Sequence, residues 1–523
     1  MISLILIGIL GFSIWYKWFK PMNHFTEIGV KQTTPWPFFG DQWLTAFKYM
    51  SFNEFYEWVY NQFPNERYSG FYQFALPTLM IRDPKLIKQI TIKDFDHFTD
   101  HRPFVDPEAD PLWGANLFSL TGQKWREMRA TVSGTFTSSK MKILFNLMNE
   151  AAEGFVNYFL DQNEDSLEVE MKDTYTRYTN DVIATMAFGI KVDSLNEPEN
   201  DFYLMGKRAT NLNGLISRIK FLGYMVFPSL LKLLKVSLFP SDVSKFFQSI
   251  IYDNIKVRKE QGLVRPDLIH FLMEANKKNS KNEETESIET SYASVEESAD
   301  MANFKQIALT NLDIAAQAVI FFFGGFDTIA TVMCFGSYEL ALNNSVQDKL
   351  RDEIVKTNKA NHGKITYAIL LKMKYLDMVV CEILRKWPPA GGIDRVVTKP
   401  YIIEPELPHE RPLHLKPGDI LMLPIGGLMR DPKYFPDPEK FDPERFSDEN
   451  KDNIEPYTYL PFGSGPRNCI GNRFGLLEVK VLIYHLLLNF KVELGKKMKV
   501  PLKLEPVFIP TADGGFWLTL KRI

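Results

Sequence analysis

Cysteine is scarce in this 523-residue chain, which holds only Cys334, Cys381 and Cys469. The three are far apart, which excludes a disulfide framework and metal-finger spacing and favours a reducing compartment for most of the chain. An excess of charge of either sign is also missing. There are 61 Lys and Arg against 64 Asp and Glu, a net charge of −3, so nothing indicates nucleic acid as a partner. No internal repeat is evident, and the length is ample for a large hydrophobic core.

The N-terminus lacks charge altogether. No charged side chain occurs from Met1 to Tyr16, and the apolar run continues past Lys17 to Phe19. A helix of about 19 residues spans roughly 28 Å, close to the hydrocarbon thickness of a bilayer. The competing interpretation, a cleaved signal peptide, would need a basic start and a small-residue cleavage site, and neither is visible. We therefore predict a transmembrane signal anchor at 1–20, a proline-containing linker at 21–50 and a folded domain at 51–523, on the cytosolic side because Lys17 and Lys20 follow the anchor.

What the chain does contain is one cysteine in a run of turn residues, Pro461 to Gly471. Glycines flank Cys469, and they can fold the main chain tightly around its sulfur. The segment from about Asn472 to Phe490 has an apolar face of helical period. A cysteine just before a helix N-terminus is stabilised as a thiolate, and a thiolate on such a turn can be an axial ligand of haem iron. The alternative is a small buried hydrophobic side chain.

A second unusual stretch lies inside a long apolar segment, Ile307 to about Leu342, which predicts one buried helix. Gly324 and Gly325 are unfavourable in a helix interior, and Asp327 adds a charge to apolar surroundings. Thr328 can bond back to the Gly324 carbonyl and loosen the helix. Close packing of helices would explain the glycines but not the Asp-Thr pair, so this stretch is a candidate functional site.

The pattern Phe462-x-x-Gly465-x-Arg467-x-Cys469-x-Gly471 resembles the haem-binding loop of the cytochrome P450 family. The resemblance implies that Cys469 is the iron ligand of a heme b group. It also implies that Arg467 contacts a haem propionate and that Phe462 packs near the sulfur.

The central helix matches the same family at Gly324, Gly325, Asp327 and Thr328. There the family has an oxygen-binding kink. The resemblance implies that Thr328 hydrogen-bonds the oxygen substrate and that Asp327 lies in the proton delivery path, since splitting O2 needs a donor and a proton route. Ile329 stands where many members have Thr or Ser, which leaves the efficiency of proton transfer open.

Three further motifs follow the family order. Trp125-x-x-x-Arg129 shares one helix face, and the resemblance implies propionate contacts for both residues and for Arg395 on a strand. Solvated surface packing is the alternative for the Trp-Arg pair. His101 or Arg102 are further candidate haem contacts. By resemblance, Glu382 and Arg385, on a helix from Met378 to Trp387, join Arg445, on a stiff non-helical segment, in a buried structural network behind the haem.

Other segments are expected around the substrate. The irregular loop 101–120 should cover the pocket, and 389–393 and 510–516 should line it. Residues 221–239 are apolar but interrupted by Pro228; they read either as a buried helix and loop or as a surface element dipping into the bilayer. Residues 276–300 are polar and read as a flexible connection.

The resemblance covers essentially the whole chain. It implies a mainly α fold with small β-sheets, the cytochrome P450 fold, in which 51–523 is a haem-binding catalytic domain. It further implies a monooxygenase in the endoplasmic reticulum membrane that takes NADPH-derived electrons from NADPH-cytochrome reductase, with cytochrome b5 as a further partner. The stretch around Phe321 to Thr328 looks most like insect microsomal members that clear toxins, so lipophilic plant compounds or insecticides are the expected substrates. Candidate reductase contacts are Lys124, Arg126, Arg473 and Lys480. A biosynthetic hydroxylase of an endogenous lipid or hormone, and a haem-containing ligand-binding protein without turnover, remain alternatives.

Overall fold

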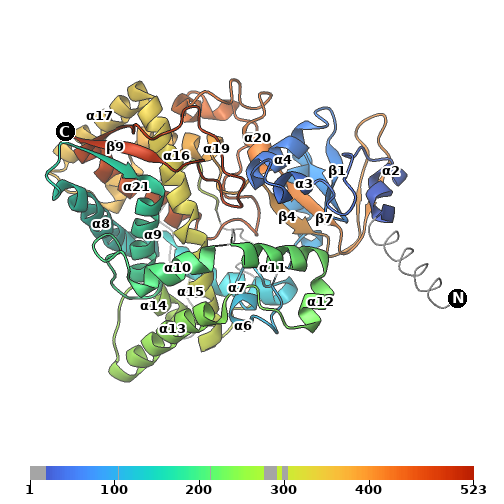
Figure 1. Ribbon diagram of the computed structural model, residues 1–523, viewed down its shortest axis with the longest axis horizontal. Helices are drawn as coiled ribbons and strands as arrows, with labels where there is room; N and C mark the ends of the chain where they lie inside the picture. Colours follow the sequence, from blue (N-terminus) through green and yellow to red (C-terminus); the bar gives the residue numbers. More distant parts are fainter. Residues whose placement is uncertain (1–18, 104, 212–213, 276–290, 297–303) are drawn as a thin grey trace.

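The computed structural model describes residues 19–523 except 104, 212–213, 276–290 and 297–303. A large lobe of packed helices lies beside a smaller lobe that holds most of the strands, and the long α15–α16 segment (Asn311–Leu342) runs through the helical lobe (Figure 1). The prediction of a mainly helical protein with small sheets is confirmed. The predicted anchor at 1–20 lies almost wholly outside the described residues.

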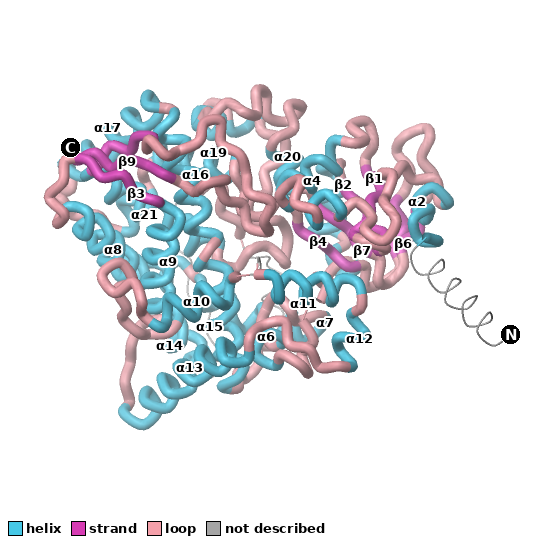
Figure 2. Tube along the Cα trace, in the orientation of Figure 1, coloured by secondary structure: helices cyan, strands magenta, loops and turns pink. Residues whose placement is uncertain are grey.

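The helices differ widely in length, and Figure 2 traces them in cyan. The longer ones are α4 (Phe52–Asn61), α7 (Gly122–Ser133), α8 (Ser138–Leu160), α9 (Met171–Ala187), α10 (Asp201–Thr210), α11 (Leu215–Val226), α13 (Ser241–Gln261), α14 (Leu268–Ala275), α15 (Asn311–Phe326), α16 (Thr328–Leu342), α17 (Asn344–Ala360), α19 (Lys374–Lys386) and α21 (Asn472–Asn489). The short ones are α2 (His24–Glu27), α3 (Trp43–Ala46), α5 (Pro84–Lys88), α6 (Pro111–Gly114), α12 (Pro228–Leu233), α18 (Tyr367–Leu371) and α20 (Ile425–Met429). A π-helical turn, η3 (Gln89–Lys93), follows α5.

The strands form three small sheets. The four-stranded sheet has the order β1-β2-β7-β4, and two smaller sheets have the orders β3-β9-β8 and β5-β6. The strands are β1 (Tyr68–Gln73), β2 (Leu76–Ile81), β3 (Ser166–Glu170), β4 (Ile393–Val396), β5 (Tyr401–Ile403), β6 (Leu413–Leu415), β7 (Ile420–Leu423), β8 (Phe490–Leu494) and β9 (Trp517–Arg522). Pro77 lies inside β2, opposite Tyr72. Proline is tolerated there because β2 pairs with β7 only from Thr78 onward.

The central helix differs from its prediction in two ways. It begins at Asn311 rather than Ile307, because Thr310 and Asp313 form a capping box that fixes the N-terminus. It is also interrupted at Asp327, which ends α15 and precedes α16. Within the described residues this is the single helical segment long and apolar enough to cross a membrane, but most of its apolar window is buried inside the protein, as in a core helix.

Three further segments can be compared with their predictions. Residues 30–41, within the predicted linker, pack onto the four-stranded sheet, since Gln32 bridges to Gly70 and Gly40 bridges to Gln73. The apolar stretch 221–239 contains the end of α11 and the six-residue α12. The predicted flexible connection falls mostly outside the described residues, although residues 291–296 are described.

Candidate functional site

The Cys469 loop is a tight turn that its glycines make possible. Gly463 and Gly465 have φ values of 75° and 72°, which disfavour other residues. A Cβ added at Gly465 would lie 1.8 Å from the Thr91 carbonyl oxygen, so η3 packs directly on this loop. The Cys469 N–H donates to the Phe462 carbonyl at 2.9 Å. This bond closes the turn around the cysteine, as the sequence pattern predicted.

Cys469 differs from the two other cysteines in its accessibility. Its side chain is exposed, whereas Cys334 and Cys381 are buried. The thiol is nevertheless closely surrounded by protein. Burial raises the pKa of Cys469. The Gly471 N–H and the charge of Arg129 offset only part of this rise. The helix N-terminus alone therefore does not favour the thiolate, contrary to the expectation from sequence; a metal ion would supply the missing positive charge.

The break between α15 and α16 uses its two glycines differently. A Cβ at Gly324 would meet nothing within 4 Å, so this face of the helix is open. A Cβ at Gly325 would lie 2.8 Å from Ile183 of α9, so this glycine permits close packing. Thr328 donates its hydroxyl back to the Gly324 carbonyl, as predicted. Asp327 turns toward α9, where it pairs with Lys172.

The packing of α21 brings the two stretches to one region. α21 begins three residues after Cys469 and packs against α16. A Cβ at Gly475 would lie 3.9 Å from Ile329, the residue after Thr328. The thiol loop and the helix break therefore lie at the same helix contact.

Buried cations surround the Cys469 loop. Arg129 of α7 donates to the carbonyl and the side-chain oxygen of Asn468, at 2.9 and 2.8 Å. Arg467 donates to the carbonyls of Thr99, Leu117 and Leu120, at 2.8, 3.1 and 2.6 Å. These bonds fasten the 99–120 loop and α7 to the residues on either side of the thiol. Burial, with repulsion from Arg395, lowers the pKa of Arg467 to about 9.

Arg395 on β4 has hydrogen-bonding capacity left over. It is fully buried and donates to the Asp394 carbonyl at 2.8 Å. Its Nε and Nη2 contact no acceptor in the described part of the chain. Burial lowers its pKa to about 10, although Asp394 opposes the shift. A buried guanidinium with two nitrogens left without an acceptor is costly, so this site favours an anion.

The sequence analysis did not identify Asp394, whose carboxylate binds His101 and Arg102 beside Arg395. Asp394 accepts from the His101 ring at 3.0 Å and from the Arg102 backbone N–H at 2.6 Å. His101 also stacks on Phe118, with ring centroids 4.7 Å apart. The contact between Asp394 and His101 could not be predicted, because the two residues lie 293 positions apart in the sequence.

Aromatic side chains pack around Phe323, which lies four residues before Asp327 on α15. Trp113 stacks on Phe239 with centroids 3.5 Å apart, and Phe323 of α15 packs edge-on against both, at 5.7 and 6.1 Å. We call these three residues the aromatic wall. Trp113 and Phe239 were not singled out from the sequence. By contrast Phe516, in the predicted lining 510–516, is fully buried in the core, edge-on to Phe335 at 4.9 Å.

The Glu382 network is present and buried. Arg385 forms a two-point pair with the Glu382 carboxylate, at 2.7 and 2.9 Å. Arg445 lies 3.6 Å from Glu382, and the Asp442 N–H donates to the same carboxylate at 2.8 Å. Arg445 was expected outside any helix, but it lies in a short 3₁₀ turn, Pro443–Phe446, whose proline occupies the first position.

The four predicted docking cations are not equivalent. Lys480 is buried and pairs with Asp377 at 2.6 Å, so its assignment as a surface contact was wrong. Arg126 is held by Asp96 at 2.6 Å. Arg473 donates to Ser138 at 3.4 Å. Lys124 is exposed.

The residues present fit a haem group. A haem needs a thiolate or imidazole ligand and cations for its two propionates. Cys469 would supply the first, while Arg129, Arg395 and Arg467 lie buried around its loop, and two Arg395 nitrogens have no acceptor in the described part of the chain. Gly324 leaves space on the open side of the break. The fold and the site thus define a haem protein with a cysteine ligand.

The comparisons with known proteins agree. The cytochrome P450 family profile matches residues 30–517. The chain is 46% identical to "Cytochrome P450 9e2" of Blattella germanica, over 96% of this chain and 94% of that one. It is 40% identical to "Probable cytochrome P450 9f2" of Drosophila melanogaster over 97% of both chains, and 33% identical to "Cytochrome P450 6k1" of Blattella germanica over 96% and 93%. The chain belongs to the cytochrome P450 family, whose members are monooxygenases that carry haem ligated by a cysteine thiolate.

Proposed function

We propose that this protein oxidises lipophilic foreign compounds, such as plant toxins or insecticides, with electrons from NADPH delivered by a reductase. The balanced reaction is RH + O2 + NADPH + H⁺ → ROH + H2O + NADP⁺. Bound haem would supply the oxygen chemistry. The single observation that carries the proposal is the exposed Cys469 on its buried loop, beside a helix break that contains Thr328 and Asp327. The similarity to insect relatives supports the choice of substrate class.

Each residue of the site has a task in this proposal. Cys469 ligates the iron, with the Phe462 aromatic ring beside the sulfur and the Phe462 carbonyl fixing the turn. Arg395, Arg129 and Arg467, with Trp125, hold the propionates and the loops around them. Thr328 orients the oxygen substrate from the open side of the break, and Asp327 supplies protons to it. The aromatic wall takes up apolar substrate and excludes water.

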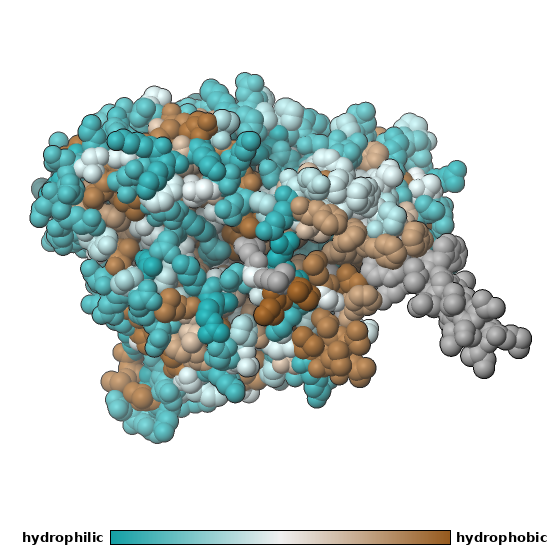
Figure 3. Space-filling model, viewed as in Figure 1, coloured by the Kyte–Doolittle hydropathy of each residue, from teal (hydrophilic) through white to brown (hydrophobic). Residues whose placement is uncertain are grey.

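The protein would work at a membrane. Exposed apolar side chains gather on α11 and around α12, where Ile216, Ile219, Phe227, Leu230, Leu233 and Leu234 are exposed. Figure 3 shows brown atoms over this part of the surface. Arg218 of α11 donates to the Ala46 carbonyl at 3.3 Å, which joins this patch to exposed Phe47. A contiguous patch of exposed apolar side chains suits a lipid surface. We therefore propose that α11 and α12 rest on the endoplasmic reticulum bilayer, together with the 1–20 anchor.

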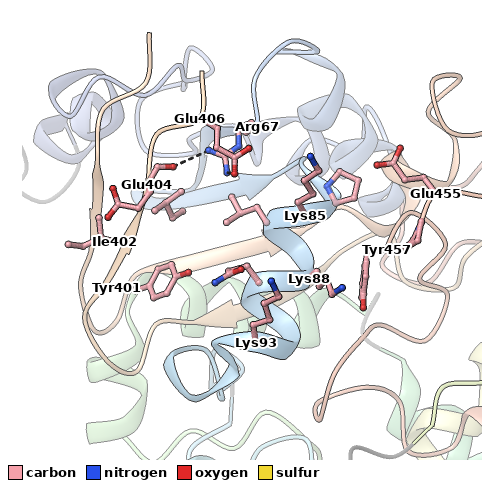
Figure 4. Close-up of a pocket in the computed structure, with 15 residues that line it drawn as sticks. Arg67, Lys85, Lys88, Lys93, Tyr401, Ile402, Glu404, Glu406, Glu455 and Tyr457 are labelled. Carbon is pink, nitrogen blue, oxygen red and sulfur yellow. Dashed lines mark hydrogen bonds and ion pairs between the residues drawn. The ribbon is translucent and has the colours of Figure 1, made fainter. Parts of the chain in front are cut away.

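A groove beside η3 is our candidate for the reductase contact. It has a volume of about 640 Å³ and lies between α5, η3 and β5 (Figure 4). Lys85, Lys88 and Lys93 line it together with Glu404, Glu406 and Glu455, and none of the three lysines forms an ion pair with any described residue. Thr91 of η3 touches Gly465 of the Cys469 loop, so this groove lies close to the expected path of electrons. A carboxylate-rich partner surface would complement the three lysines, and cytochrome b5 would compete for the same face.

The test uses the full chain in membranes with a co-expressed reductase and p-nitroanisole, an apolar aryl ether that gives a coloured phenol. We expect NADPH-dependent phenol formation that Cys469→Ser abolishes. Thr328→Ala should retain the thiolate-type haem spectrum but form less phenol per NADPH. A thiolate-type spectrum with no product from p-nitroanisole or any other lipophilic compound would favour a binding protein without turnover. Product from a single endogenous lipid alone would favour a biosynthetic hydroxylase.

A further inference from the structure

Lys172 occupies a central position beside the helix break. It is the second residue of α9, and its ammonium pairs with the Asp327 carboxylate. The same ammonium donates to the Asp327 carbonyl at 3.3 Å and to the Thr331 hydroxyl at 2.8 Å. An ammonium has three donors, so these acceptors use all of them. Lys172 is therefore bound to both ends of the first turn of α16.

The start of α9 is itself fixed, which makes Lys172 a rigid partner. The Glu170 carboxylate caps α9 by accepting the N–H groups of Lys172 and Asp173, at 3.2 and 2.9 Å. Glu170 also accepts the Phe516 N–H at 2.9 Å, which ties the cap to the C-terminal segment. Farther along α9, Thr179 donates to the Phe326 carbonyl at 2.7 Å. α9 thus supplies a side-chain donor to each of the two carbonyls at the break.

This contact determines where Asp327 points. Asp327 and Thr331 are one helical turn apart and share the face toward α9, whereas Thr328 bonds back to Gly324. Side chains at neighbouring helix positions diverge, so the carboxylate does not contact the Thr328 hydroxyl in this arrangement. Lys172 and Asp327 are each about one-fifth exposed, at 22% and 20%. The pair therefore meets solvent on the α9 side of the break.

We propose that Lys172 is a positioning residue for proton delivery: it holds Asp327 at the solvent-facing seam between α9 and α16, where the carboxylate takes up protons for the Thr328 side. This inference rests on the proposed function. Two protons per O2 must reach the site for one oxygen atom to leave as water. If proton delivery fails, the two electrons from NADPH are released as hydrogen peroxide: O2 + NADPH + H⁺ → H2O2 + NADP⁺. Lys172 thus controls how many NADPH molecules yield product.

The first measurement needs no turnover. Urea unfolding of the detergent-solubilised full chain is compared for wild type, Lys172→Met, Asp327→Asn and the double variant. If Lys172 positions Asp327, the two single effects are not additive, because either substitution already removes the ion pair. Additive effects would overturn the inference whatever the turnover shows.

The second measurement follows phenol, NADPH and H2O2 in membranes with reductase and p-nitroanisole. Lys172→Met should lower phenol per NADPH by roughly tenfold, less than the loss of a proton-transfer group itself, and raise H2O2 to match. The thiolate-type spectrum and the KM for p-nitroanisole should stay unchanged. The solvent deuterium isotope effect should change. Lys172→Arg, which keeps the cation, should restore much of the phenol yield, and Lys172→Met should add nothing to Asp327→Asn.

Lys207→Met is the matched control, since Lys207 also pairs with a carboxylate of α9, Asp173, at 2.9 Å but forms no ion pair with Asp327. Its phenol yield should equal that of wild type. An unchanged phenol yield in Lys172→Met, or an equal loss in Lys207→Met, would overturn the inference. No product from the wild type would instead overturn the proposed function, and the proton-delivery role with it, even if the unfolding effects were not additive.

Discussion

The guanidinium carbon of Arg467 lies 4.2 Å from the centroid of the Trp125 ring. Both side chains are buried, and they come from the Cys469 loop and from α7. The stack covers one face of the guanidinium, while its N–H groups reach three backbone carbonyls of the 99–120 loop. Arg467 therefore holds together the loop that would ligate the iron and the loop expected to cover the substrate.

Arg467→Lys should loosen both loops. A lysine has no planar fork and cannot reach three carbonyls at once, so the variant should lose about 2–4 kcal/mol of unfolding free energy. We expect faster proteolysis within residues 101–120 and easier loss of haem. Limited proteolysis with mass spectrometry, and haem content after gel filtration, measure these effects. Lys124→Gln, on an exposed lysine one residue from Trp125, is the control; equal proteolysis of both variants would contradict the role of Arg467.

Cys469→Ser should remove the thiolate-type absorption of the carbon monoxide complex, because a serine hydroxyl is not deprotonated by iron as readily as a thiol. Cys334→Ala should keep it, since Cys334 is buried in α16 and its pKa is raised by burial beyond the range where a thiolate forms. Difference spectra of both variants decide the ligand. A thiolate spectrum in Cys469→Ser would exclude Cys469.

Glu382→Gln should destabilise the protein through the two arginines that Glu382 pairs with. Removing one partner of a buried pair leaves uncompensated charge and typically costs about 3–5 kcal/mol. The control is Glu444→Gln, since Glu444 pairs with Lys349 at the surface at 2.5 Å; such pairs are worth about 0–1 kcal/mol. Urea unfolding midpoints separate the two. If Glu382→Gln cost no more than the control, the network would not support the fold.

Interactions between residues close in sequence could be predicted, whereas those between distant residues could not. The Cys469 turn and the Thr328 back-bond were predictable because glycine turns and hydroxyl-to-carbonyl bonds act within a few residues. The pairing of Lys172 with Asp327 joins residues 155 apart and has no local signal. The sequence was misleading at Lys480, because its charge suggested a surface position, whereas Asp377 on α19 neutralises this charge in the interior. The start of α15 differs from its prediction because the apolar periodicity extends back to Ile307, whereas the Thr310–Asp313 capping box sets the N-terminus at Asn311.

Charge reversal in the groove should weaken reductase binding. Lys85→Glu, Lys88→Glu and Lys93→Glu together should cost about 1–2 kcal/mol of binding free energy, roughly tenfold in Kd, at low ionic strength. The difference should shrink as salt is added, because exposed charges are screened. Titration of reductase against the rate of haem reduction measures the apparent Kd. Lys245→Glu on α13, at an exposed lysine that forms no ion pair with any described residue, is the control; a similar loss there, or a loss that salt does not reduce, would place the contact elsewhere.

Asp41 gives a test of stability against pH in the segment before β1. It is buried, and one carboxylate oxygen accepts the Thr33 hydroxyl and the Tyr72 N–H, at 2.6 and 2.7 Å. The other oxygen, Oδ1, contacts no donor in the described part of the chain. Burial raises the pKa of Asp41 to about 6, from 3.8, against these two hydrogen bonds.

Because the folded state raises this pKa, folding favours the protonated carboxyl group. Its contribution is fully present below about pH 4 and is lost as the pH rises through about 6, a change of up to about 3 kcal/mol. Asp41→Asn should keep both accepted hydrogen bonds, put an amide in place of the unpartnered oxygen and remove the charge. We therefore expect the variant to unfold at higher urea than wild type at pH 7.5, and the two to converge below about pH 4. Asp448→Asn, at an exposed site, should not reproduce this pattern. An Asp41→Asn variant that is less stable than wild type at pH 7.5 would mean that the ionised carboxylate contributes to holding this segment on β1.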